Sequence, residues 1–206
     1  MQIVLNGIAK SYGRETVLKG LVLTIASGSR TVVVGANGSG KSTLLQLLAG
    51  AALPTTGTVS HRHMSRELPA DDVYRHVSIA APYLNLYAEL SLQETIAFHA
   101  RFKPFRQGTD VISVAHAARL EHVLHKPVQH FSSGMAQRLK LALAILSDTS
   151  LLLLDEPASN LDQAGVRWYQ ELLAAHLDER TLVVASNHQA AEHSLCDQRI
   201  EVERYK

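Results

Sequence analysis

The spacing of apolar residues changes twice along the first part of the chain, and each change marks a different kind of element. Over residues 1–30 apolar and polar positions alternate, which is typical of antiparallel strands with one buried face. Residues 31–34 form a β-branched run, a glycine-rich segment follows, and leucines then recur at helical spacing over residues 44–48. This order predicts a strand, a tight loop and a helix.

The second half of the chain repeats the alternation of strand and helix. Short buried strands are predicted at residues 151–154 and 182–185, with a helix over residues 166–177 between them. Such alternation favours a mostly parallel sheet covered by helices. Before them, residues 83–130 lack β-branched runs and show helical spacing, with a break at residues 103–108.

We therefore predict one α/β domain over residues 1–206, which is an ordinary length for a single domain. It should contain a mostly parallel core sheet, N-terminal antiparallel strands and an inserted helical sub-domain. With the helix that starts after residue 130, this sub-domain spans about residues 83–145.

Composition narrows the range of partners. Apolar residues make up 46% and charged residues 19% of the chain, so a folded core is expected. A net charge of +1 supplies no overall field for nucleic acid or an anionic membrane, so no nucleic-acid partner is expected. The longest apolar run, residues 141–146, is far shorter than the roughly 20 residues that span a bilayer. A single cysteine and no signal-peptide pattern favour the cytoplasm.

Eleven histidines raise the hypothesis of a metal site. The paired ones have no cysteine or carboxylate at ligand spacing, so we expect solvated surface histidines instead. The candidates are His61, His63, His122, His125 and His130.

Residues 35–42 match the pattern G-x-x-x-x-G-K-[ST] at every fixed position. Glycines allow a tight loop whose N–H groups face a phosphate, and the following helix presents its positive end to the same anion. Lys41 is expected to reach the β- and γ-phosphates of ATP, and the Ser42 hydroxyl to bind Mg²⁺. The candidate nucleotide-binding residues of this segment are Gly35, Ala36, Asn37, Gly38, Ser39, Gly40, Lys41, Ser42 and Thr43.

The predicted strand at residues 151–154 ends in two carboxylates, Asp155 and Glu156. Charge at the edge of a core is costly unless something compensates it, and Mg²⁺ beside the phosphate loop would do so. Asp155 is therefore a candidate metal ligand together with Ser42. Glu156 is a candidate general base that polarises the attacking water.

Further segments carry a resemblance to a known family. Residues 131–138, Phe-Ser-Ser-Gly-Met-Ala-Gln-Arg, resemble the signature motif of ATP-binding cassette (ABC) ATPases, and residues 159–162 resemble the D-loop of that family. Residues 186–188 are similar to its H-loop, and Tyr12 stands where the family has an aromatic residue that stacks on adenine. The motifs follow the family's order and extend over the whole chain. The chain therefore resembles an ABC transporter ATP-binding subunit with a P-loop NTPase core.

The resemblance implies roles for residues outside the phosphate loop. His188 would contact the γ-phosphate and act in catalysis with Glu156 and Lys41. The signature segment would bind the nucleotide held by a second ABC subunit, in a head-to-tail homodimer. The residues that the resemblance adds to the nucleotide site are Tyr12, Ser132, Ser133, Gly134 and Asp162.

Each of these segments also has a structural interpretation. Ser132 or Ser133 could simply cap a helix, and residues 159–162 could form a capping box. His188 could be a surface histidine, and Tyr12 could be an ordinary aromatic residue after a strand.

The chain departs from the family at several positions. Phe131, Ser133 and Met135 differ from the commonest signature, and the expected Q-loop glutamine is missing near Tyr83. A phenol does not bind Mg²⁺ as an amide oxygen does, so the link from the metal to the membrane partner is changed.

The resemblance implies an ATPase that powers a transmembrane permease subunit on a separate chain. Such a subunit would be peripheral at the cytoplasmic face of the membrane and held there only by its partner, which we expect to dock around Tyr83 to Glu94 and on the helical insert. A soluble non-transport ABC ATPase of DNA repair or translation is the alternative, and a subunit without catalysis is a third. A non-transport ABC ATPase usually needs a coiled coil or a second cassette. The presence of Lys41, Glu156 and His188 argues against a subunit without catalysis.

Overall fold

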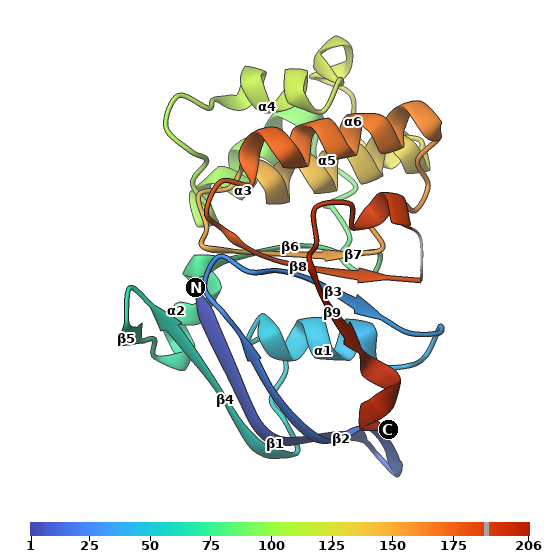
Figure 1. Ribbon diagram of the computed structural model, residues 1–206. Helices are drawn as coiled ribbons and strands as arrows, with labels where there is room; N and C mark the ends of the chain where they lie inside the picture. The colour runs from blue at the N-terminus through green and yellow to red at the C-terminus, as the bar shows by residue number, and fades with distance from the viewer. Residues whose placement is uncertain (188–189) are drawn as a thin grey trace.

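The computed structural model describes residues 1–187 and 190–206, whose strands form two sheets (Figure 1). The first is antiparallel, with the order β2-β1-β4-β5. Its strands are β1 (Gln2–Tyr12), β2 (Glu15–Ile25), β4 (Thr56–His63) and β5 (Arg66–Glu67). The alternating N-terminal pattern is thus confirmed as a pair of long antiparallel strands.

The second sheet is parallel throughout, with the order β6-β7-β8-β3-β9. Its strands are β3 (Arg30–Val34), β6 (Val77–Ala80), β7 (Leu151–Asp155), β8 (Thr181–Ser186) and β9 (Gln198–Glu201). Every residue of β7 and β8 is buried, as expected for parallel strands covered on both faces.

Helices and sheets stack in layers (Figure 1). Helix α1 (Lys41–Leu48) lies between the two sheets, and α5 (Ser133–Leu146) and α6 (Gln163–His176) cover the opposite face of the parallel sheet. One apolar cluster joins β1 and β2 to α1 and the near face of the parallel sheet, and a second joins the far face to α5 and α6.

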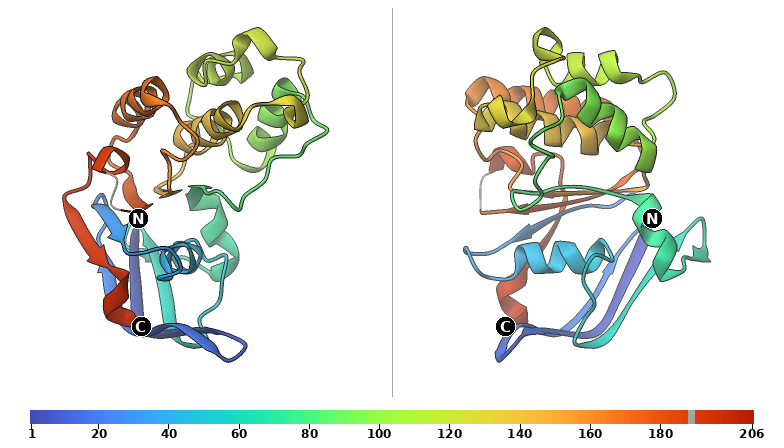
Figure 2. Two further views of the ribbon diagram at one scale, coloured as in Figure 1. Left: turned by 90° about the vertical axis from the view of Figure 1, so that its right-hand side faces the viewer. Right: turned by 180° about the vertical axis from the view of Figure 1, so that it is seen from behind.

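The connection from β6 to β7 contains further helices that stand to one side of the parallel sheet (Figure 2). They are α3 (Leu92–Phe102) and α4 (Val111–Ala117), which pack on α5 around a third apolar cluster. Ser91 and Glu94 form a capping box at the start of α3. The remaining helices are short, and they are α2 (Ala70–Val73), η1 (Tyr74–His76), η2 (Glu121–Val123), η3 (Val128–His130), η4 (Ala190–Glu192) and η5 (Val202–Tyr205).

Four strands have no clear signal in the sequence, and one of them, β5, has only two residues. Strand β4 has the sequence Thr-Gly-Thr-Val-Ser-His-Arg-His, with a single large apolar residue, so no alternation is visible. Strands β6 and β9 have four residues each, which is too short for a period to be recognised. They form by pairing with neighbours that are themselves well specified.

The expectation of surface histidines is wrong for His61. This side chain is buried, and its Nε2 donates to the carbonyl oxygen of Leu48 at 2.8 Å, which fastens β4 to the end of α1. Burial lowers the pKa of His61, so the ring is neutral at pH 7. His122, His125 and His130 are exposed.

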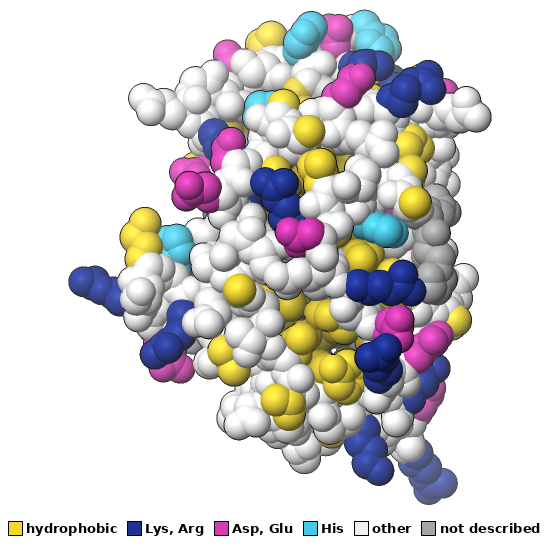
Figure 3. Space-filling model, viewed as in Figure 1, with side chains coloured by type: hydrophobic (Ala, Val, Ile, Leu, Met, Phe, Trp, Pro, Cys, Tyr) yellow, Lys and Arg dark blue, Asp and Glu magenta, His cyan; other side chains and the backbone are white. Residues whose placement is uncertain are grey.

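Within residues 1–187 and 190–206, no helix is both long and apolar enough to cross a membrane. On the face shown in Figure 3, basic and acidic side chains are interspersed rather than gathered into a field of one sign.

His99 on α3 is the most strongly perturbed histidine that the structure describes. Ser147 donates its hydroxyl proton to the carbonyl oxygen of Leu143 at 2.6 Å, so its oxygen accepts from His99 Nε2 at 2.9 Å. The ring also stacks on Phe105. Burial, with the nearby Lys103 charge, lowers the pKa of His99 to about 4.

The unfolding free energy should therefore depend on pH through His99. Because the folded pKa is depressed, its contribution is fully present above the unfolded value of about 6.5 and is lost as the pH falls towards 4. Between pH 7 and pH 5 the loss should be about 1 to 2 kcal/mol. His99→Gln, which keeps an N–H donor for Ser147, should remove that loss in urea unfolding, while His122→Gln on the surface should keep it. An unchanged pH slope in His99→Gln would contradict the assignment.

Candidate functional site

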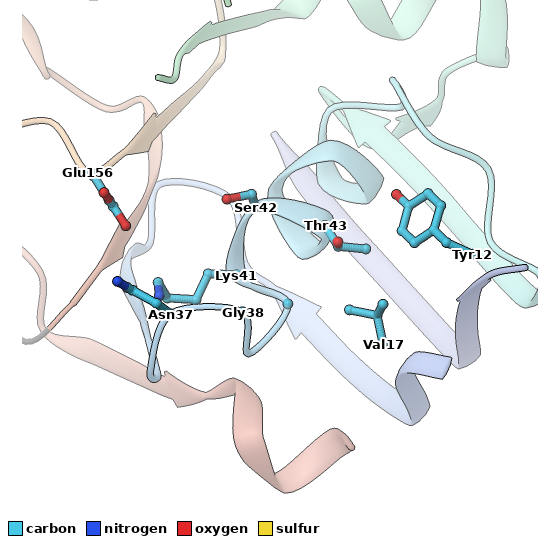
Figure 4. A pocket seen from close by; sticks show the side chains of 9 residues that line it. Tyr12, Val17, Asn37, Gly38, Lys41, Ser42, Thr43 and Glu156 are labelled. Carbon is cyan, nitrogen blue, oxygen red and sulfur yellow. The ribbon is translucent and has the colours of Figure 1, made fainter. Parts of the chain in front are cut away.

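A pocket of about 430 Å³ opens where the chain leaves β3 (Figure 4). Tyr12 and Val17 come from the antiparallel strands, Glu156 faces them from beyond the end of β7, and the loop before α1 lies between. The carboxyl ends of parallel strands are the usual place for a ligand in α/β proteins. The lining residues are Tyr12, Val17, Asn37, Gly38, Gly40, Lys41, Ser42, Thr43 and Glu156.

Two glycines of the loop have no substitute. A Cβ on Gly35 would lie 2.5 Å from Ser39 Oγ and 2.9 Å from a methyl group of Val202. Gly40 has φ 103°, and its Cβ would lie 2.9 Å from a methyl group of Val17. The side chains of the antiparallel strands and of η5 therefore require the loop to be this tight. Glu203 of η5 also accepts from the Ala36 N–H at 2.9 Å.

The ammonium group of Lys41 is folded back on its own loop. Lys41 is only 5% exposed, and its Nζ donates to the carbonyl oxygens of Gly35 at 2.9 Å and Ala36 at 3.1 Å. A third hydrogen bond goes to Oδ1 of Asn187. These three acceptors use all three protons of the ammonium group.

Asp155 at the end of β7 is an almost fully buried carboxylate, 2% exposed. Among the residues that the structure describes, neither of its oxygens has a well-formed hydrogen bond. Burial raises its pKa, and the nearby Ser42 hydroxyl and Lys41 charge only partly oppose the rise. Such a carboxylate needs a compensating group.

Glu156 follows with φ 47°, a left-handed conformation that is unfavourable for a residue with a side chain. Its N–H donates to the carbonyl oxygen of Ala185 at 2.9 Å, which carries the pairing with β8 one residue beyond β7. Its carboxylate accepts from Nδ2 of Asn187 at 2.6 Å. The strained turn therefore directs the carboxylate into the pocket.

The signature and D-loop residues lie in a different pocket of about 240 Å³. Ser132 and Gly134 of the signature line it with Asp162, whereas Ser133 is exposed and not part of the lining. Within one chain these residues do not meet the phosphate loop.

Ser132 and Asp162 are also helix caps. The Ser132 side chain accepts from Met135 N–H at the start of α5, and Asp162 accepts from Gly165 N–H at 2.7 Å at the start of α6. The capping interpretation is thus right for these two residues. Ser159, by contrast, caps no helix, because its hydroxyl is buried without a partner among the described residues.

The two tyrosines of uncertain role both lie near the phosphate loop. Tyr12 is half exposed at the mouth of the pocket, with the Lys10 ammonium 4.7 Å from its ring centre. Tyr83 lies close to Gln46 of α1, and burial raises its pKa.

The sequence reasoning missed Asn187 and Glu192, and His188 lies outside the described residues. Glu192 is 2% exposed, accepts from Ala158 N–H at 3.1 Å and from the Ser186 hydroxyl, and joins the ends of β7 and β8. The only signal for Asn187 was its place one residue before the candidate histidine.

Comparisons with known proteins agree with this geometry. Residues 18–159 match the ABC transporter family. The chain is 32% identical to the cytochrome c biogenesis ATP-binding export protein CcmA of Rhizobium meliloti, over 92% of each chain. It is also 32% identical to the Nod factor export ATP-binding protein I of the same species, over 95% of this chain and 59% of that protein.

Solved structures show the same fold. A dimeric bacterial ABC transporter cassette aligns with a TM-score of 0.81 and 23% identity, over 98% of this chain and 95% of that one. A bacterial Atm1-family ABC exporter with ATP bound aligns with a TM-score of 0.79 and 21% identity, over 98% of this chain and 37% of that one. The chain belongs to the ABC transporter family, in which it is an ATP-binding subunit that hydrolyses ATP to drive transport.

Proposed function

We propose that this subunit powers export through a permease on a separate chain, by closing with a second copy of itself around ATP. The observation that carries the proposal is the pocket in which the phosphate loop faces Glu156. The relatives whose names specify export, and which align over almost their whole length, support the direction.

In this proposal the loop residues Gly35 to Thr43 hold the phosphates through N–H groups and the Lys41 charge. Tyr12 offers its ring to the adenine, at the mouth of the same pocket. Glu156 is the general base, His188 acts with it at the γ-phosphate, and Lys41 completes the catalytic set.

Ser42 and Asp155 are the residues that would hold Mg²⁺. These residues fit the ion because Asp155 is a buried carboxylate without a well-formed partner and lies near the Ser42 hydroxyl. When bound, the ion would neutralise charge on the phosphates. Without it, Asp155 carries an uncompensated desolvation cost.

The second copy supplies what one chain lacks. Ser132, Ser133, Gly134 and Asp162 lie away from the phosphate loop, so the nucleotide of one copy can meet them only in another. The N-terminus of α5 would face the γ-phosphate with its positive end. A homologous cassette is known as a dimer.

The permease would dock on exposed apolar residues near Tyr83 and on α3. Tyr87 packs edge-on against Phe98, which in turn contacts Phe102, and all three rings are exposed. An aromatic cluster of this kind suits an apolar protein partner, and no nucleic-acid partner is proposed. The subunit would lie at the cytoplasmic face of the membrane through this contact alone.

Lys41→Ala should weaken ATP binding about 10- to 100-fold, because it removes a charged donor to the phosphates. Calorimetric titration with ATP measures this directly. Lys19→Ala makes the same change on the exposed surface of β2 and should bind as the parent does. Parent-like affinity in Lys41→Ala would refute the phosphate-loop assignment.

Glu156→Gln should bind ATP but hydrolyse it at least about 100-fold more slowly, since the amide cannot take a proton from water. Trapped ATP should then hold two copies together, seen as a dimer by size-exclusion chromatography with light scattering. Glu67→Gln, an exposed residue of β5, should turn over ATP normally and run as the parent does. A monomer of Glu156→Gln at saturating ATP would count against the composite site.

Tyr87→Ser and Phe102→Ser together should abolish co-purification with a polytopic membrane protein from detergent-solubilised membranes. Leu53→Ser removes an equally exposed apolar residue outside the cluster and should leave co-purification intact. Retention of the membrane protein by the double variant would place the docking surface elsewhere.

A further inference from the structure

The described end of β8 carries a side chain that touches both charged groups of the nucleotide pocket. Asn187 accepts from the Lys41 ammonium through Oδ1 and donates to the Glu156 carboxylate from Nδ2, at 2.6 Å for the second bond. Lys41 and Glu156 are 115 residues apart in the sequence. Among the described residues, no other side chain hydrogen-bonds to both.

Sheet register explains why this position can bridge them. β8 lies between β3 and β7, with Ser186 level with Val34 and Ala185 level with Asp155. The residue after Ser186 therefore stands between the start of the phosphate loop and Glu156. An amide fits here because it presents an acceptor and a donor at once.

The bond to Asn187 is the one that Lys41 can give up. All three ammonium protons are used, two of them by carbonyl oxygens of the lysine's own loop. To reach a phosphate oxygen, Lys41 must release one acceptor, and the carbonyls of Gly35 and Ala36 are fixed by the backbone. The Lys41 ammonium can leave Oδ1 of Asn187 while Nδ2 of the same amide keeps its bond to Glu156.

Glu156, by contrast, gains from keeping its bond. Its backbone is strained at φ 47°, and Asn187 is the donor that holds its carboxylate in the described structure. A carboxylate held by one N–H keeps its other oxygen free to accept a proton from water.

We propose that Asn187 is a positioning residue with two opposed effects. It competes with ATP for the Lys41 ammonium before binding, and afterwards it orients the Glu156 carboxylate for hydrolysis. The inference rests on the proposed roles of Lys41 and Glu156. It adds that Asn187 lowers the affinity for ATP and raises the rate of hydrolysis.

The test is a pair of variants at position 187. Asn187→Ala removes both bonds, so ATP affinity should rise about 3- to 10-fold while kcat falls about 10- to 100-fold. Asn187→Asp keeps an oxygen for Lys41, adds an ion pair and loses the donor, so ATP affinity and kcat should both fall about 10-fold or more. Affinity is measured by calorimetry with ATP in EDTA, where no hydrolysis intervenes, and kcat by phosphate release with Mg²⁺.

A structural role alone would lower affinity and kcat together. Asn6→Ala, at an exposed asparagine of β1, is the matched control and should change none of these quantities. Weaker ATP binding or an unchanged kcat in Asn187→Ala would overturn the proposal.

A third variant separates the two effects. In a Glu156→Ala background, adding Asn187→Ala should leave the residual rate within about 2-fold, because Asn187 acts on turnover through Glu156. The gain in affinity should persist there. A further large fall in rate would show that Asn187 does not act through Glu156.

The failure of the proposed function can be told apart from the failure of this inference. If Lys41→Ala bound ATP normally, the proposed function itself would fail. If Lys41→Ala and Glu156→Gln behave as expected and Asn187→Ala does not, only this inference fails.

Discussion

The parallel register of β7, β8 and β3 is the constraint on which the rest of the site depends. These neighbours end level with one another, so the residues that follow them meet at one edge although they are far apart in sequence. The loop after β3 brings Lys41, the end of β7 brings Asp155 and Glu156, and β8 brings Asn187. A slip of one residue between two of these strands would turn their side chains to opposite faces and separate the groups.

Keeping charges at this edge is costly, and the fold offsets the cost unevenly. Lys41 has three acceptors, whereas Asp155 is buried with no well-formed partner among the described residues, and burial raises its pKa. Nearby, burial also raises the pKa of Glu192, whose carboxylate nevertheless receives bonds from Ala158 and Ser186. Glu192 therefore holds the ends of β7 and β8 together, while the buried charge of Asp155 is only partly compensated by a cation among the described residues.

Much of this arrangement could be predicted from the sequence, because the signals were local. The glycine spacing of the phosphate loop, the apolar run before Asp155 and the two capped helices each lie within about 15 residues. Strands β4, β6 and β9 could not be predicted, since they are short or polar and gain stability by pairing with distant partners.

The missed contacts have the same cause. Asn187 belongs to no pattern at a fixed spacing, and it acts through residues that only the fold brings near. His61 was misjudged for a related reason. A histidine in a polar stretch is expected at the surface, but the partner that buries it, the carbonyl of Leu48, is on another element.

One helix connects the two half-sites of a single chain. The N-terminus of α5 is at Ser132, in the pocket lined by signature and D-loop residues. Five residues further along, the buried Gln137 donates to the carbonyl oxygen of Pro157 at 3.0 Å. Pro157 directly follows Glu156 in its strained turn. In the proposed dimer, a group that contacts the first turn of α5 would act, through this buried hydrogen bond, on the backbone next to Glu156. Helices α3 and α4 pack on the same helix around the third apolar cluster. In the proposed function, the contact between Gln137 and Pro157 would be a common point of action for nucleotide, second copy and partner.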